Sequence, residues 1–299
     1  MMKHKRQNAF KLTNLSKRYP EFELGPLNLE LDPGSVLGFV GPNGAGKTTT
    51  IQCLMGLIRS DGGNIEIFGR ENDPNDPKWK FDVGYVGDKH KFYERWSCRK
   101  NLEFLSQFYP NWSHKLVDEL AKRFDLNLSK KASEISKGNR VKLSLISALG
   151  HSPKLLLFDE PTVGLDPVVR TELLDVLFEV VETGERAIFY STHILSDISR
   201  LADSFAFLRN GQLILKTQKE DLTEKWRKIS FRLEGEVPQF ENGVSLRSEG
   251  KEHQVISSDY EVTLKQLGEC GAENVHNNRM SIEEIAVQIL KEKENVASV

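Results

Sequence analysis

The chain has 299 residues with 41 basic and 43 acidic side chains, a near balance that gives no large field of one sign and does not favour a nucleic-acid partner. Its three cysteines, Cys53, Cys98 and Cys270, are scattered and form no CxxC pair, so they support neither a disulfide framework nor a zinc site and fit a reducing cytosol. No apolar run reaches the ~20 residues needed to cross a bilayer, and no apolar segment follows the basic start MMKHKRQNAF as in a secretory signal.

The first predicted elements are two short strands within LNLELDPGSVLGFV, residues 27–40, joined by an Asp-Pro-Gly turn. The second strand runs directly into a glycine-rich stretch. After that stretch, KTTTIQCLMGLIRS at 47–60 carries apolar residues at helical spacing, from Ile51 to Ile58. The order strand, loop, helix is therefore predicted here.

The loop between them is GPNGAGKT, residues 41–48, which fits the phosphate-binding pattern G-x-x-x-x-G-K-[ST] in the structural context that this pattern requires. Three glycines let the backbone wrap closely around phosphate oxygens and turn its N–H groups inward. Lys47 supplies a cation for the β and γ phosphates, and the Thr48 hydroxyl is placed to bind Mg2+. The following helix points the positive end of its dipole at the same anion.

The segment from about 90 to 150 differs from its surroundings, because NLEFLSQF, KLVDELAKRF and VKLSLISALG all show helical periodicity with no strand between them. We expect a helical subdomain inserted between strands of the sheet. Within it, FYPNW at 108–112 is expected to form a turn with aromatic packing, since Pro110 and Asn111 break the pattern.

Two more apolar runs, KLLLF at 154–158 and AIFY at 187–190, are too short for helices and are typical of parallel strands buried on both faces. The helical pattern VVRTELLDVLFEVVE lies between them. This alternation predicts an α/β fold with a parallel sheet.

Two carboxylates follow the first of these strands in LLLFDEP. Asp159, at the strand end, is suited to hold Mg2+ together with Thr48 and water. Glu160 comes next and is placed to orient or deprotonate an attacking water molecule. An Asp-Glu pair after a strand is weak by itself, but downstream of a phosphate-binding loop it indicates nucleotide hydrolysis.

Beyond residue 217 the composition becomes more polar, and KISFRLEG, EHQVISS, VTLKQLGEC and SIEEIAVQILKE predict a strand, a strand, a helix and a helix. The last helix has one apolar face, which is expected to pack on its own core. At this length about two domains are expected, so the region is predicted to be a small α+β accessory domain.

This combination of motifs resembles the ATP-binding-cassette (ABC) ATPases over roughly residues 8–217. The family's signature turn, usually Leu-Ser-Gly-Gly-Gln, has its counterpart in ISKGN at 135–139. Ser136 and Gly138 match, whereas Lys137 replaces a glycine and Asn139 replaces the glutamine, similar to a variant of some bacterial exporter ATPases. A serine N-cap followed by glycine leaves helix N–H groups free to cap a γ-phosphate. In the family that phosphate belongs to a second subunit, so two chains meet head to tail around two ATP.

The resemblance implies three further roles. GLDP at 164–167 resembles the D-loop, in which Asp166 would communicate across the dimer. His193, after a buried strand, matches the switch histidine that contacts the γ-phosphate, and Tyr19 matches the aromatic residue that stacks on adenine. The residues expected to contact ATP are Tyr19, Gly41, Pro42, Asn43, Gly44, Ala45, Gly46, Lys47, Thr48 and Thr49.

One position departs from the family pattern. VGYVGD at 83–88 resembles the strand that leads to the Q-loop, but Asp88 stands where glutamine or glutamate is usual. The side chain is one methylene shorter, which favours a water-bridged contact with Mg2+ over a direct one.

The resemblance implies a P-loop NTPase cassette over 8–217, an accessory domain over 218–299, and a Mg-dependent ATPase with Lys47, Glu160 and His193 as catalytic residues. We expect a peripheral subunit on the cytoplasmic face of a bacterial membrane. It would pair with a second ATPase subunit, identical or related, and drive separate membrane subunits, as in exporters. Two alternatives stay open: a soluble cassette acting on ribosomes or DNA, and a regulatory module without turnover. The sequence leaves the cargo and its direction of transport open.

Overall fold

The computed structural model describes residues 7–73, 75–87, 91–182, 184 and 186–291. The chain divides into two compact units, one comprising Met1–Asp203 with Leu208–Leu213 and the other Ser204–Phe207 with Ile214–Val299. The strands β9 (Ser204–Arg209) and β10 (Gln212–Gln218) contain residues of both units. No helix among these described residues is long and apolar enough to cross a bilayer.

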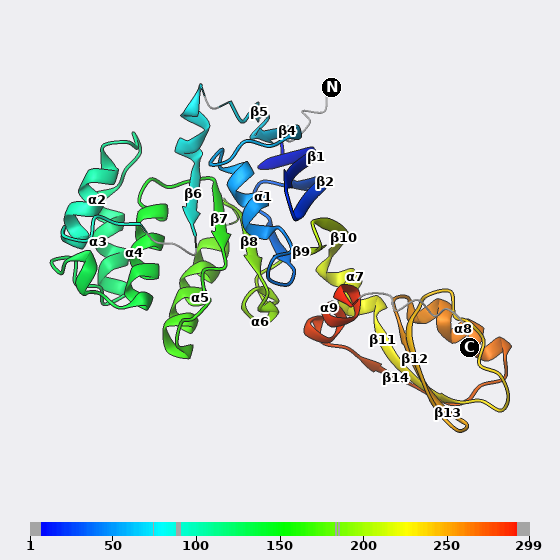
Figure 1. Ribbon diagram of the computed structural model, residues 1–299. Helices are drawn as coiled ribbons and strands as arrows, with labels where there is room; N and C mark the ends of the chain where they lie inside the picture. The colour runs from blue at the N-terminus through cyan, green and yellow to red at the C-terminus, as the bar shows by residue number, and fades with distance from the viewer. Residues whose placement is uncertain (1–6, 74, 88–90, 183, 185, 292–299) are drawn as a thin grey trace, which may run out of the picture. The chain divides into compact units, whose positions relative to one another are not determined.

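An antiparallel sheet opens the first unit. It has the order β2-β1-β4-β5 and is formed by β1 (Phe10–Tyr19), β2 (Phe22–Leu31), β4 (Gly62–Ile67) and the short β5 (Arg70–Glu71) (Figure 1). Alternate residues of β2 are buried, as expected for a strand with one face on a core.

A parallel sheet follows, in which β3 (Val36–Val40) pairs with β8 (Ala187–Thr192), β8 with β7 (Leu155–Asp159), and β7 with β6 (Val83–Val86). Every residue of β3, β7 and β8 is buried. The apolar runs that predicted these strands are continuous because the sheet is covered on both faces, so no position of a strand faces water. The α/β prediction is therefore confirmed.

The first helix, α1 (Lys47–Leu54), packs against β7 and β8. It is shorter than the helix predicted for 47–60. The helix ends at Leu54 with Met55 as its C-cap, and the chain turns at Gly56, whose φ of 62° lies in the left-handed region that glycine adopts without strain. The apolar residues beyond Leu54 thus belong to a turn.

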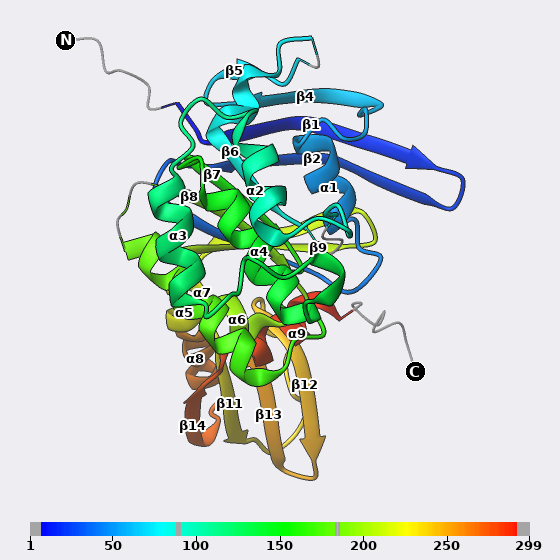
Figure 2. The ribbon, with the colours of Figure 1, turned by 90° about the vertical axis from the view of Figure 1, so that its left-hand side faces the viewer.

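The segment predicted to be a helical subdomain contains three helices, α2 (Cys98–Ser106), α3 (His114–Arg123) and α4 (Lys137–Leu149), which lie side by side in both views (Figures 1 and 2). Each begins with a serine N-cap, Ser97, Ser113 and Ser136, whose side chain accepts a hydrogen bond from the backbone N–H three residues on. Short 3-10 helices lie at Pro77–Asp82 and Ala132–Glu134. In the turn at 108–112, Tyr109 stacks on His151 with 4.0 Å between ring centroids.

Two helices complete the first unit. The longer, α5 (Pro167–Glu182), lies between β7 and β8 in the chain, and the single-turn α6 (Leu195–Ile198) follows β8.

The second unit contains an antiparallel sheet of order β12-β13-β11-β14, formed by β11 (Arg227–Arg232), β12 (Gly243–Glu249), β13 (Glu252–Ser257) and β14 (Glu273–Arg279). Its helices are α7 (Lys219–Lys225), α8 (Tyr260–Glu269) and α9 (Ile282–Leu290). The four predicted elements correspond to β11, β13, α8 and α9. The sequence pattern did not indicate β12 and β14, because most of their side chains are exposed, or α7, because only Leu222 of that helix is buried.

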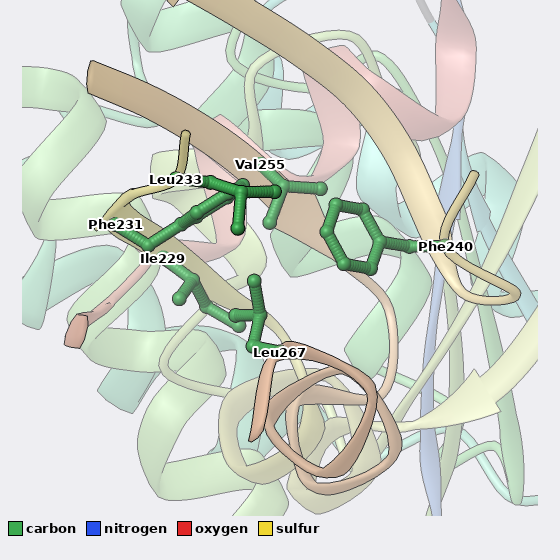
Figure 3. Packing of buried hydrophobic residues seen from close by; sticks show 6 residues of the cluster. All are labelled: Ile229, Phe231, Leu233, Phe240, Val255 and Leu267. Carbon is green, nitrogen blue, oxygen red and sulfur yellow. The ribbon is translucent and has the colours of Figure 1, made fainter. Parts of the chain in front are cut away.

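The core of this unit is a cluster in which Phe231 on β11 lies edge-on to Phe240, with 5.7 Å between ring centroids, and α8 contributes Leu267 (Figure 3). The six buried residues of this cluster are Ile229, Phe231, Leu233, Phe240, Val255 and Leu267. All six come from the second unit, which therefore buries a core of its own.

We predict that Phe231→Ala destabilises the second unit by about 3–5 kcal/mol, because the 1% exposed ring leaves a cavity that its neighbours fill only in part. Amide hydrogen exchange of peptides from β11 and β13 measures this local stability. Val244→Ala on β12, where the side chain is 39% exposed, is the matched control and should change exchange little. Unchanged exchange in the Phe231 variant would show that the cluster does not hold the unit together.

Candidate functional site

The loop that joins β3 to α1 is built for an anion. Gly44 and Gly46 have φ angles of 79° and 108°, and a Cβ atom on Gly46 would lie only 2.6 Å from the Leu24 side chain. The N-cap of α1, Gly46, offers no side-chain hydrogen bond, and the first turn holds no acidic residue. The N–H groups at this helix start are therefore left for a ligand, at the positive end of the helix dipole.

Lys47 is almost fully buried and turns back over the loop. Its Nζ donates to the carbonyl oxygens of Gly41, at 2.7 Å, and Pro42, at 3.1 Å. The same ammonium group lies 2.9 Å from Oε1 of Glu160, whose side chain is 13% exposed. Because the pair is largely withdrawn from water, each charge depends on the other for compensation.

Glu160 also contacts His193. Nδ1 of the His193 ring lies 2.8 Å from Oε2 of Glu160, so the two carboxylate oxygens are divided between a lysine and a histidine. The backbone of Glu160 adopts a φ of 52°, uncommon for a residue with a side chain, and its N–H donates to the carbonyl of Ser191 on the neighbouring strand. This geometry aims the carboxylate at the phosphate-binding loop.

Asp159, at the end of β7, is 1% exposed and accepts hydrogen bonds at Oδ1 from Thr48 Oγ1, at 3.1 Å, and from Ser191 Oγ, at 2.8 Å. Burial raises the pKa of the Asp159 carboxyl above its usual value, against the opposing effect of these two donors. A hydroxyl and a carboxylate at hydrogen-bond distance are ligands that Mg2+ prefers, and phosphate oxygens complete such sites. The described residues contain no cluster of three His, Cys, Asp or Glu side chains that could hold a metal by themselves.

Of these groups, Lys47, Thr48, Glu160 and His193 border a cavity of about 630 Å³, a size that suits a small-molecule ligand. Its lining residues are Tyr19, Phe22, Asn43, Gly44, Gly46, Lys47, Thr48, Thr49, Glu160, Val163 and His193. Phe22 and Val163 were not among the residues predicted from the sequence. Phe22 lies 6.5 Å from Tyr19 between ring centroids, and its position three residues after Tyr19 could have revealed it as a second aromatic wall.

The other predicted site residues lie elsewhere. The backbone carbonyls of Gly41 and Pro42 accept hydrogen bonds from Nζ of Lys47. The carbonyl of Pro42 also accepts from the N–H of Ala45, which closes the turn of the loop. Asp159 does not line the cavity, but it accepts a hydrogen bond from Thr48, which does. Asp88 lies outside the described residues.

The predicted signature and D-loop residues are not in the cavity lining. Ser136 caps α4 by accepting from the N–H of Asn139 at 3.2 Å, and Lys137 and Gly138 occupy the first turn of that helix. Asp166 accepts from two backbone N–H groups of α5, each at 3.1 Å. Among the described lining residues of the cavity, none comes from these two segments.

The fold and the site define a P-loop NTPase: a parallel sheet, a glycine-rich anion loop at the start of a helix, and an acidic strand end that faces it. A family model described as "ABC transporter" matches residues 24–163. The bacitracin transport ATP-binding protein BcrA of Bacillus licheniformis is 34% identical over 227 residues, 75% of this chain and 74% of BcrA. The ABC transporter ATP-binding protein YtrB of Bacillus subtilis is 30% identical over 214 residues, 72% of this chain and 73% of YtrB.

A solved structure of the ATP-binding subunit of an ABC transporter covers 72% of this chain and 91% of its own length, with a TM-score of 0.65 and 29% identity. The chain therefore belongs to the ABC transporter family, as an ATP-binding subunit with ATPase activity.

We predict that Asp159→Asn stabilises the nucleotide-free protein at neutral pH. Because the folded state raises the pKa of this carboxyl, folding favours its neutral form, and stability is lost as the pH rises through the raised pKa. Asparagine removes the buried charge and can still accept from Thr48 and Ser191. The melting temperature of the variant should exceed that of the wild type at pH 7, and the gap should close below about pH 4, near the ordinary pKa of aspartate. Equal melting temperatures at pH 7 would contradict the buried-charge argument.

Proposed function

We propose that this protein is the ATP-hydrolysing subunit of a bacterial exporter, in which two such subunits close head to tail around two ATP and drive separate membrane subunits. The observation that carries the catalytic part is the arrangement of Lys47, Glu160 and His193 around one cavity. The exporter assignment is supported by the similarity to BcrA, described as a bacitracin transport protein, and by the Ser-Lys-Gly signature. We assign the ATPase domain to residues 8–217 and an accessory role to 218–299.

The residues of the site suggest how binding and hydrolysis are ordered. In the structure, Nζ of Lys47 lies 2.9 Å from Oε1 of Glu160 and compensates its charge. While this ion pair persists, the carboxylate would be a poor base. A triphosphate in the loop offers Lys47 a stronger partner than one carboxylate, so Lys47 would leave Glu160 for the β and γ phosphates. Oε1 of Glu160 then becomes available to accept a hydrogen bond from water, while His193 keeps Oε2 in place.

Thr48 and Asp159 are the residues that would hold Mg2+, which when bound withdraws charge from the β and γ phosphates. Tyr19 and Phe22 give the cavity an aromatic wall on which adenine can stack. The signature residues Ser136, Lys137, Gly138 and Asn139 lie outside the chain's own cavity lining, which fits a role toward ATP held by a second subunit. Asp166 would lie at the same contact between subunits.

We predict that Glu160→Gln lowers kcat by at least about a hundredfold and traps a dimer in the presence of ATP and Mg2+. Glutamine keeps the size of the side chain but cannot accept the proton of water, so the closed state persists. Size-exclusion chromatography with light scattering measures the dimer. The same variant with ADP and the double variant Lys47→Ala with Glu160→Gln are the controls, and both should stay monomeric. A Glu160→Gln chain that remains monomeric with saturating ATP would contradict the head-to-tail proposal.

The transporter assignment is tested by the proteins that accompany the subunit. We expect that tagged Glu160→Gln protein, expressed in its native host and extracted in mild detergent with ATP, recovers an integral membrane protein in stoichiometric amount, identified by mass spectrometry. The identity of that protein would narrow the cargo, and Lys47→Ala, prepared in parallel, shows which partners depend on nucleotide. Recovery of ribosomal or DNA-bound proteins, with the ATPase absent from membranes, would favour the soluble class of cassette proteins instead.

A further inference from the structure

The proposed mechanism leaves one buried acidic residue unexplained. The side chain of Asp197, on α6, is fully buried, at 0% exposure, four residues after His193. A carboxylate in such a place is strongly unfavourable unless other groups pair with it and hydrogen-bond to it.

Two side chains provide that compensation. The guanidinium of Arg170 forms an ion pair with Oδ1 of Asp197, and the hydroxyl of Thr162 donates to Oδ2. Arg170 also donates to Ser196 Oγ at 2.8 Å, which holds its planar group in one orientation. Both oxygens of Asp197 are therefore engaged.

Both partners of Asp197 lie close in sequence to predicted site residues. Thr162 lies two residues after Glu160, and Arg170 lies in the first turn of α5, where its N–H donates to the carbonyl of Asp166 at 3.0 Å. Asp197 thus joins the segments that follow Glu160, Asp166 and His193, which are separated by up to 35 residues in the chain.

The contact between Glu160 and His193 depends on how those segments are held. It joins the residue after β7 to the residue after β8, and the backbone bond from Glu160 to Ser191 fixes only the ends of the strands. Beyond the strands, the bond between Thr162 and Asp197 holds the two segments together, and Arg170 connects both to the start of α5.

We propose that Asp197 is a positioning residue for ATP hydrolysis, which holds His193 against Glu160 and makes this contact depend on the start of α5. The inference rests on the proposed roles of His193 and Glu160. Asp197 does not line the cavity and acts only through these neighbours. A shift of α5 would move Arg170, and with it the alignment of the carboxylate that activates water.

The test compares two full-length variants that weaken the contacts of Asp197 with Thr162 and Arg170 to different degrees. Asp197→Asn removes the charge, and Thr162→Val removes one hydroxyl at nearly constant volume. Asn101→Ala is the matched control for stability, because Asn101 is 2% exposed, bonds to the backbone of Tyr93 and Ser97, and belongs to no part of the site. Steady-state kcat and KM for ATP with Mg2+ are measured for each, together with the melting temperature.

A second readout reports the positioning directly. The 15N resonance of His193 Nδ1, assigned among the seven histidines with His193→Ala, senses its bond to Glu160 in the nucleotide-free protein. We expect Asp197→Asn to lower kcat by about tenfold or more with KM changed less than about threefold, and to shift the Nδ1 resonance. Thr162→Val should act in the same direction by a smaller factor. Asn101→Ala should leave kcat and the resonance unchanged despite a lower melting temperature.

Two results would overturn the inference: an active wild type whose Asp197→Asn variant keeps kcat within about twofold, or an Asn101→Ala variant that loses kcat in parallel with its stability. If Asp197→Asn does not fold, Thr162→Val decides, and an unchanged kcat and Nδ1 resonance in that variant reject the link. A wild-type chain that does not hydrolyse ATP would instead reject the proposed function. In that case the Nδ1 resonance alone decides whether Asp197 holds His193.

Discussion

Parallel pairing of β3, β8 and β7 is the constraint on which the candidate site depends. The register aligns Val40 with Thr192, and Asp159 with Ser191, so the three strands end together at one edge of the sheet. The phosphate-binding loop follows β3, His193 follows β8, and Asp159 ends β7 with Glu160 directly after it. Parallel strands need long connections, so residues more than a hundred positions apart in sequence meet at this edge.

The charged side chains buried at this edge of the sheet lower the stability of the fold. An aspartate, a glutamate and a lysine are withdrawn from water there, and burial raises the pKa of Asp159. The nucleotide-free chain reduces this cost by pairing Lys47 with Glu160 and by giving Asp159 two hydroxyl donors. In the proposed mechanism, the same pairing would keep Glu160 engaged until a phosphate competes for Lys47. If the proposed roles hold, this single ion pair both lowers the cost of burial and links catalysis to substrate binding.

Local sequence patterns predicted the features of the fold and site that depend on residues adjacent in the chain. GPNGAGKT and LLLFDEP carry their strand context with them, so the loop, β7 and its carboxylates could be predicted without the structure. The end of α1 could not, because Gly56 and the packing there override the apolar spacing beyond Leu54. The edge strands β12 and β14 were missed because exposed strands of mixed polar residues lack alternation. Asp197 was missed because its partners are 27 and 35 residues away, a distance at which no spacing rule applies.

The predicted signature turn, which departs from the family pattern at Lys137, lies close to the predicted D-loop. A Cβ on Gly164 would lie 2.6 Å from the ammonium of Lys137, so the Lys137 side chain reaches the predicted D-loop. A Cβ on Gly138 would lie 3.0 Å from Val169, so the start of α4 approaches the start of α5 closely. The predicted signature and D-loop segments thus lie together within one chain, and Arg170 extends this contact to Asp197 and the segment after His193. In the proposed dimer, an anion that docks on the signature of one chain would therefore act on the catalytic pair of that same chain.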